Sequence, residues 1–153
     1  MADTSLNENR LALLIWQTSN FWQSKIRHKL KESKITLSEY LILETIYLLQ
    51  QKNINITQQD ICKNASIDRS VVSVRVSKLE EKKLILKQRP KDKRSDNLIL
   101  TSEGNNLINN IIDNIVDLEN ELFNKLGSEI FNFTNSLKLL LGKKIRIRAK
   151  LND

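Results

Sequence analysis

The chain has 153 residues and a mass of 17.8 kDa, about the length of one domain that can bury its own core. Its 3 Gly and 1 Pro are too few for the tight turns of an all-β fold, its 1 Cys excludes an intrachain disulfide, and its 1 His argues against a His-based metal site. The formal net charge of +7 favours an anionic partner, and nucleic acid is the first candidate.

The two long apolar patterns in the first third of the chain predict helices. Residues 6–30 repeat at steps of three and four along one helical face, at Leu11, Ile15, Thr18, Trp22 and Ile26. Residues 37–50 form a second helix with the same kind of periodicity. The first nine residues lack the basic and apolar regions of a signal peptide, and no apolar run approaches the ~20 residues that cross a bilayer. We therefore expect a cytoplasmic protein without a membrane partner.

A pair of helices with a tight connection follows. Thr57 is the expected N-cap of a short helix that ends near Asn64, with Asp60 in the capping-box position. Asp68 caps a longer helix that runs to about Lys83. A short helix, a tight connection and a longer helix have the spacing of a helix-turn-helix motif.

The helix pair leads into a predicted β-hairpin with a polar tip. Residues 84–89 and 97–100 are expected to form strands, and Pro, Asp and Ser in residues 90–96 favour a turn between them. A basic hairpin after a helix-turn-helix makes the region a winged helix. The predicted fold class is therefore mainly α (α+β), a winged helix-turn-helix with long N- and C-terminal helices.

The C-terminal third is predicted to be helical again. Thr101 caps a long helix with a heptad-like seam at Ile108, Ile111, Ile115, Leu118 and Leu122. The seam could pack between subunits or inside one subunit. Gly127 and Ser128 break the chain, and a last helix carries Ile130, Phe133, Leu137, Leu140 and Leu141.

Charge is segregated along the sequence. Residues 68–94 contain ten basic and four acidic residues, whereas residues 103–121 contain five acids and no base. Most of the net charge therefore lies in the second helix of the pair and the hairpin. A structural charged hairpin is the alternative interpretation, but a surface that is only solvated has no reason to separate charge in this way.

A helical wheel of the second helix of the pair separates two faces. Val72, Val76 and Leu79 cluster on one side and should pack on the core. The opposite side is small and hydroxylic, with one exposed valine, at Ser70, Ser73, Val74, Ser77 and Lys78. Short side chains let a helix approach base edges in a major groove, where Ser can donate or accept and an apolar residue can contact a thymine methyl. Arg69 can reach a base or a phosphate, and Lys78 is better placed for phosphate.

Several segments together resemble the MarR family of regulators. The segment 67–85, IDRSVVSVRVSKLEEKKLI, looks like the recognition helix of that family. The segment 89–95, RPKDKRS, with 98–104, LILTSEG, resembles its D-x-R wing and the L-T-x-x-G start of the next helix. The segment 36–40, TLSEY, resembles the opening of its second helix. The resemblance covers nearly the whole chain, but Lys83 stands where the family usually has Gly. A non-glycine residue in the left-handed conformation costs about 1 kcal/mol, so we expect the turn there to be altered.

The resemblance implies a homodimer that binds double-stranded DNA. Residues about 35–101 would form the winged helix-turn-helix region, and residues about 5–32 and 102–150 the dimerisation helices of a single domain, 1–153. It also implies that Arg94 enters the minor groove while Asp92 pairs with it or orients it. The candidate DNA-binding residues are Arg69, Ser70, Ser73, Val74, Ser77, Lys78, Lys91, Asp92, Lys93 and Arg94.

Other conspicuous residues admit two interpretations each. Trp16, Phe21 and Trp22 could line a cleft for a small aromatic or anionic effector, as family members often have, or belong to the dimer interface. Cys62 is expected to be a buried, inert thiol, and His28 a solvated helix residue. The basic tail, residues 143–150, is either a solvated helix end or an added phosphate contact.

The sequence thus predicts a sequence-specific DNA-binding transcription regulator, most simply a repressor with a pseudo-palindromic operator. The alternative is a winged helix that binds protein or bends DNA without regulated sequence reading. An enzyme is disfavoured because the chain has no G-x-G-x-x-G, P-loop, H-E-x-x-H or paired Cys motif. No cofactor and no metal are expected.

Overall fold

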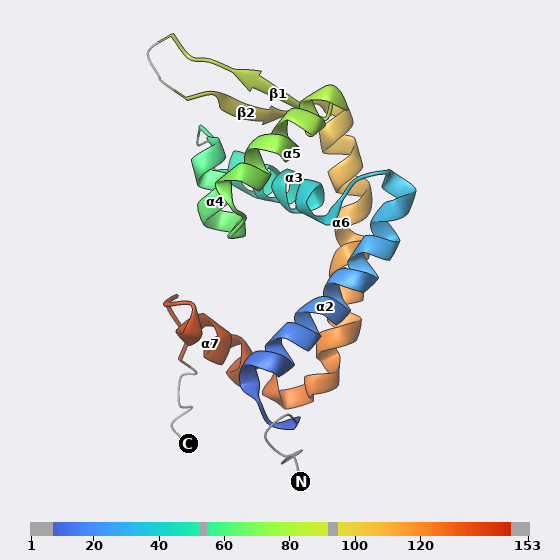
Figure 1. Ribbon diagram of the computed structural model, residues 1–153, viewed down its shortest axis with the longest axis vertical. Coiled ribbons are helices and arrows are strands. Elements are labelled where there is room, and N and C mark those ends of the chain that lie inside the picture. Colours follow the sequence, from blue (N-terminus) through green and yellow to red (C-terminus); the bar gives the residue numbers. More distant parts are fainter. Residues whose placement is uncertain (1–7, 53–54, 92–94, 148–153) are drawn as a thin grey trace, which may run out of the picture. The chain divides into compact units, whose positions relative to one another are not determined.

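The computed structural model describes residues 8–52, 55–91 and 95–147. The chain divides into two compact units, residues 1–116 and 117–153, and one helix runs through the boundary between them. The first unit contains, in order, α2 (Leu11–Leu30), η1 (Lys31–Ser33), α3 (Leu37–Gln50), α4 (Gln58–Ala65), α5 (Arg69–Glu81), β1 (Ile85–Gln88), β2 (Asn97–Leu100) and the start of α6 (Ser102–Phe123). The fold class is confirmed: helices dominate, with one two-stranded sheet (Figure 1).

Local capping signals explain where the helices begin. Thr57 Oγ1 accepts from the Asp60 amide at 3.3 Å, and Asp60 Oδ2 accepts from the Thr57 amide at 2.9 Å, which is a complete capping box. Asp68 caps α5, and Thr101 Oγ1 accepts from the Gly104 amide at 3.0 Å at the start of α6. These predicted starts are confirmed, whereas α2 begins at Leu11 rather than at residue 6 as predicted, after an extended Arg10.

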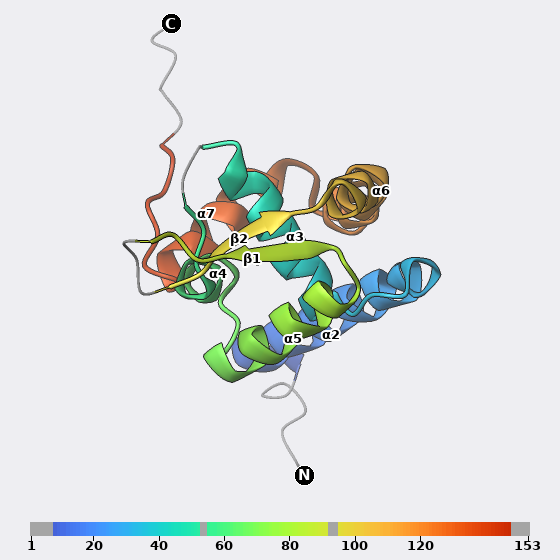
Figure 2. The ribbon, with the colours of Figure 1, turned by 90° about the horizontal axis from the view of Figure 1, so that it is seen from above.

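The core of the first unit lies where α3, α5 and the hairpin meet. β1 pairs antiparallel with β2, so that Ile85 lies opposite Leu100. Figure 2 shows the hairpin passing over α3, which contacts β2. The fully buried side chains come from every element of this unit except η1, and include Ile26, Ile42, Ile46, Ile61, Val76, Leu79, Ile85, Leu98 and Ile108. Because α5 and the base of the hairpin pack on the same hydrophobic core, their positions relative to each other are fixed.

The connection from α5 to α6 is tightly packed. The expected alteration of the turn is not found, because Lys83 itself adopts the left-handed conformation with φ of 61°. That conformation costs a non-glycine residue about 1 kcal/mol. A Cβ added to Gly104 would lie 2.1 Å from the carbonyl oxygen of Leu84, so α6 can approach the residue before β1 this closely only with glycine at this position. Thr101 Oγ1 also donates to the carbonyl of Lys83 at 2.7 Å. The wing and the long helix therefore start from one fixed junction.

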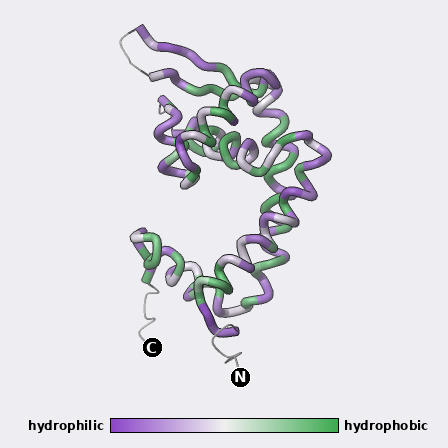
Figure 3. Tube along the Cα trace, viewed as in Figure 1, coloured by the Kyte–Doolittle hydropathy of each residue, from purple (hydrophilic) through white to green (hydrophobic). Residues whose placement is uncertain are grey.

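The second unit is built differently. It consists of the end of α6, η2 (Asn124–Glu129), α7 (Ile130–Leu140) and a following segment to residue 147. The predicted break is confirmed, because Gly127 has φ of 56° inside η2. No residue of the described part, 117–147, is buried, although Figure 3 shows extended hydrophobic stretches along α7. The side-chain amide of Asn135 holds the segment after α7 through two hydrogen bonds to the backbone of Arg146.

The heptad-like seam predicted for α6 was expected to pack either inside one subunit or between subunits, and its two halves differ in burial. Ile108, Ile111 and Ile115 are buried within the single chain, as the packing-inside-one-subunit interpretation requires. Leu118 and Leu122 are half-buried and lie in the second unit. None of the helices in the described part of the chain has the length and hydropathy that crossing a membrane requires.

Candidate nucleic-acid interface

The helix α5 presents one face to the core and the opposite face to solvent, as the helical wheel predicted. Val72, Val76 and Leu79 are fully buried, and α5 contacts α3, α4 and β1. The Asp68 carboxylate accepts from the Arg69 amide at 3.2 Å and so begins the helix at the predicted residue. Because one face is fully packed, the rotation of α5 about its axis is set, and so is the set of residues that it exposes.

The exposed face contains every α5 residue that the sequence assigned to it. Ser70, Ser73, Val74, Ser77 and Lys78 are all exposed, with Val74 at 58%. Ser77 donates its hydroxyl hydrogen to the carbonyl of Ser73 at 3.2 Å, a bond along the helix that leaves both hydroxyl oxygens able to accept. A face of this kind can approach the edges of bases closely.

The sequence analysis missed one residue of this surface. Val71 is 38% exposed and lies beside Ser70 at the start of α5. A helical wheel that includes Val71 indicates its exposure, because position 71 lies about 100° from Val72 and thus at the edge of the buried face. Two valines, rather than one, therefore offer apolar contacts to a partner.

The wing is a short hairpin whose outer end is polar. The Arg89 guanidinium pairs with Asp96 at 3.1 Å and closes the hairpin beyond the last strand residues. Lys91 is exposed. The predicted minor-groove residue Arg94, with Asp92 and Lys93, lies outside the described residues.

Two carboxylates outside residues 68–94, those of Glu39 and Asp96, offset part of the positive charge that the sequence count assigned to this region. Five of its ten basic residues pair with carboxylates: Arg75 and Lys82 with Glu39, Lys78 with Glu81, Lys87 with Glu80, and Arg89 with Asp96. Within the described residues, Arg69, Lys83 and Lys91 are left without an ion pair. The count missed Glu39 because this residue lies in α3, far outside the segment that was counted.

A surface cavity of about 540 Å³ lies between the start of α4, the start of α5 and the wing. It is lined by Thr57, Gln58, Gln59, Cys62, Arg69, Arg89, Ser95 and Asp96. The prediction that Cys62 is buried is wrong: the thiol is half-buried and lines this cavity, because the neighbouring Ile61 occupies the core position of α4. All the other residues that line the cavity have polar or charged side chains.

The candidate effector residues lie on α2. Trp16 is 65% and Phe21 48% exposed, and Trp22 is half-buried. Lys25 Nζ lies 5.1 Å from the centroid of the Phe21 ring, a cation–π contact. A second subunit or an effector can cover these exposed rings, so both interpretations of the three residues stay open. His28 is exposed, as predicted.

Comparisons with known proteins agree with this geometry. Residues 33–95 match the family model described as MarR family. The chain is similar to MepR of Staphylococcus aureus in its complex with DNA, at 28% sequence identity and a TM-score of 0.79, over 86% of this chain and 96% of that chain. MepR is a transcription regulator of the multidrug efflux pump MepA.

Two further structures share the fold at lower identity. BpsR of Bordetella bronchiseptica, whose DNA binding is regulated by 6-hydroxynicotinic acid, is 17% identical with a TM-score of 0.74, over 88% of this chain and 100% of that chain. CouR of Rhodococcus jostii RHA1, solved with p-coumaroyl-CoA, is 15% identical with a TM-score of 0.77, over 92% of this chain and 97% of that chain.

Proposed function

Since this chain is a MarR-type winged helix transcription regulator, we propose that it is a repressor that binds a pseudo-palindromic operator as a homodimer. The observation that carries the proposal is the exposed face of α5, which consists of short hydroxyl and valine side chains on a helix whose rotation is fixed by its buried face. A helix that contacted only the DNA backbone would gain more from long basic side chains there.

Each candidate residue has a role in this proposal. Ser70, Ser73, Val74 and Ser77 meet base edges in the major groove, where the valine contacts a thymine methyl. Arg69 and Lys78 contact phosphates at the two ends of that face, and Lys91 and Lys93 do so from the wing. Arg94 enters the minor groove, aimed by Asp92.

A homodimer determines the form of the operator. Two copies of α5 related by a two-fold axis read two half-sites of opposite orientation, with centres about one helical turn, 10–10.5 bp, apart. The exposed apolar residues of α2 and α7 support the dimer, because a second copy can cover them. We propose the cytoplasm as its location, because a transcription regulator needs access to chromosomal DNA.

Release by a small aromatic or anionic effector completes the proposed function. Trp16, Phe21 and Trp22 are the residues proposed to contact it, since aromatic rings give a flat apolar surface against which an aromatic acid can stack. BpsR responds to such an acid, which supports the class of molecule.

The proposed function is tested by selecting targets from a random DNA library and footprinting the best of them. We expect two protected half-sites in inverted orientation, a complex that survives excess random DNA, and lower transcription from a promoter that carries the site. A complex that random DNA displaces as easily as the selected target would contradict sequence reading and favour the alternative, a winged helix that binds DNA or protein without it.

A further inference from the structure

One charged side chain stands out in the core of the first unit. Among the described residues, Glu39 is the one charged residue that is buried, with 1% of its surface exposed. It lies in the first turn of α3, at the third position after the N-cap Thr36, whose side-chain oxygen accepts from the Glu39 amide at 3.2 Å. None of the interactions proposed above with DNA uses it.

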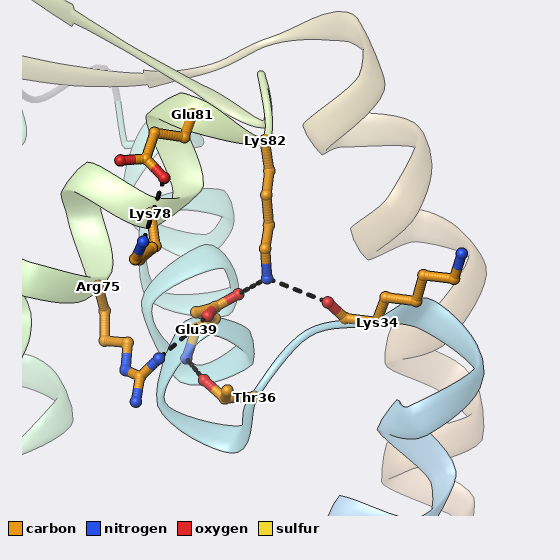
Figure 4. Close-up of polar contacts among 7 residues, drawn as sticks. All are labelled: Lys34, Thr36, Glu39, Arg75, Lys78, Glu81 and Lys82. Carbon is orange, nitrogen blue, oxygen red and sulfur yellow. Dashed lines mark hydrogen bonds and ion pairs between the residues drawn. The ribbon is translucent and has the colours of Figure 1, made fainter.

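The carboxylate of Glu39 holds two cations of the recognition helix. Oε2 accepts from Lys82 Nζ at 2.6 Å, and Oε1 lies 3.4 Å from Arg75 Nη1 (Figure 4). Lys82 Nζ also donates to the backbone carbonyl of Lys34 at 3.0 Å. Lys34 has φ of 55° and turns the chain from η1 into α3. One carboxylate thus links α3, α5 and the end of the N-terminal helical segment.

The two cations that contact Glu39 are far apart along α5. Arg75 lies in the middle of α5 and Lys82 is its C-cap, seven residues or about two turns later. The buried face decides which residues α5 exposes, and two points fixed along the helix add its position along its axis and hold its rotation within that packing. The buried face of α5 consists of aliphatic side chains, whose attraction is non-directional, whereas charge-assisted hydrogen bonds require a defined geometry.

We propose that Glu39 is a positioning residue for sequence-specific DNA binding, because its carboxylate fixes where α5 presents the Ser70–Ser77 face. The inference rests on the proposed function, since it concerns the same recognition helix. Glu39 contacts no DNA in this account. It acts through Arg75 and Lys82, and its removal should therefore change the discrimination between sequences rather than the attraction to the backbone.

The expected result differs from that of general destabilisation. Glu39→Gln removes the charge and one acceptor oxygen, so Arg75 and Lys82 are released and the region becomes more positive. Affinity for random DNA should then stay the same or rise, with an unchanged or steeper salt dependence. Affinity for the selected target should fall, so that the ratio of the two affinities drops about tenfold or more, which is the size of one mismatched base pair.

The matched control is Glu81→Gln. Glu81 is an exposed carboxylate that pairs with Lys78 within α5 at 3.3 Å, so the substitution makes the same charge change without touching the link to α3 (Figure 4). Its affinity ratio should stay within about twofold of the wild type, because exposed pairs contribute little. Both variants are measured as the full chain against selected and random DNA, with thermal unfolding of each variant recorded alongside.

A second pair of variants keeps the test decisive if Glu39→Gln does not fold. The side chain of Lys82 is 38% exposed, so Lys82→Met should be tolerated while it removes both the Glu39 and the Lys34 contacts. Lys82→Arg retains a cation that can reach the carboxylate. We expect the affinity ratio to fall in Lys82→Met and to be restored in Lys82→Arg.

Two results would overturn the inference. One is a folded Glu39→Gln or Lys82→Met variant whose affinity ratio equals that of the wild type. The other is a parallel loss of affinity for both DNAs that follows the loss of thermal stability, which indicates a purely structural role. Failure of the proposed function is distinguishable from both, because the wild-type protein itself would then show no preference for any selected target.

Discussion

The DNA-binding region and the C-terminal unit use their apolar residues in opposite ways. The buried hydrophobic side chains of the described residues all fall between Ile26 and Ile115. In the described part of the C-terminal unit, 117–147, none is buried, although α7 and the segment after it carry exposed Ile130, Phe133, Leu140 and Ile147. The winged helix therefore completes its core within one chain, whereas the C-terminal unit does not.

The same division occurs within α2. Its last residues, Ile26 and Leu30, are buried, but Leu11, Ile15 and Trp16 near its start are exposed. Exposed apolar surface on this scale marks an interaction site rather than a free surface. The chain therefore has two kinds of apolar face: one is buried and folds the chain, and the other is exposed and is the face that a second copy covers in the proposed dimer.

The largest expected effect is the loss of the dimer when a charge is placed on the exposed apolar face of α7. Leu140 of α7 is 74% exposed, and Leu140→Glu should shift the protein from a dimer to a monomer of 17.8 kDa, because a buried carboxylate without a partner is costly. Sedimentation at micromolar concentration measures the change. Operator affinity should fall with it, because one half-site gives much weaker binding than two.

The matched substitution lies in the wing. Leu86 of β1 is 50% exposed, and Leu86→Glu should leave the dimer intact. If the wild-type protein sediments as a monomer, or if the two variants shift the mass equally, the distinction between the two regions is lost.

The second prediction compares a glycine from each region. Gly104→Ala places a methyl group 2.1 Å from the Leu84 carbonyl oxygen, which should lower the free energy of unfolding by about 2–3 kcal/mol. Gly142→Ala has open space but φ of 67°, so it should cost about 1 kcal/mol. Urea denaturation gives both values. If both substitutions lowered the free energy of unfolding equally, the junction between the wing and α6 would accommodate a methyl group as readily as the C-terminal segment does.

The third prediction compares substitutions in the wing with a substitution on the exposed face of α5. Arg94→Ala should weaken binding to most sequences and lower the salt slope by up to about 1, since log K changes by roughly 0.9 per phosphate contact. Ser73→Ala should leave the slope unchanged and relax the preference at one or two base pairs by about 1–3 kcal/mol. Asp92→Ala should resemble a mild form of the Arg94 change. Salt titrations on selected and random DNA measure all three, and wild-type behaviour of Arg94→Ala would remove the wing from the interface.

Local signals made most of the fold predictable. The caps at Thr57, Asp68 and Thr101 act over three residues or fewer, and the wheel of α5 depends on its own sequence alone. The starts of α4, α5 and α6 and both faces of α5 therefore follow from the sequence, whereas the start of α2 does not. The ends of β1 were predicted one residue too long on each side, because strand ends depend on pairing with the other strand.

Long-range contacts account for what the sequence left out. Glu39 meets Arg75 and Lys82 across 36 and 43 residues, so no count within a segment could reveal that these charges are compensated. Cys62 was predicted to be buried because its neighbour Ile61 is apolar, but only the packing of α4 decides which of two adjacent residues faces the core. Gly104 belongs to the L-T-x-x-G pattern in the sequence, but its close approach to the Leu84 carbonyl depends on how the chain folds.

The smallest effect concerns the turn that joins the recognition helix to the wing. Lys83 donates to the Glu80 carbonyl at 2.9 Å and Leu84 donates to the Leu79 carbonyl at 3.0 Å, which is the bonding pattern of a Schellman motif with Lys83 at the left-handed position. Glycine adopts that conformation without steric cost, although it also increases the entropy of the unfolded chain. Lys83→Gly should therefore raise the free energy of unfolding by about 0.5–1 kcal/mol. Lys83→Ala removes the same side chain but keeps the Cβ, so it should give no gain. Equal stability of the two variants in urea denaturation would show that the left-handed Lys83 is not strained.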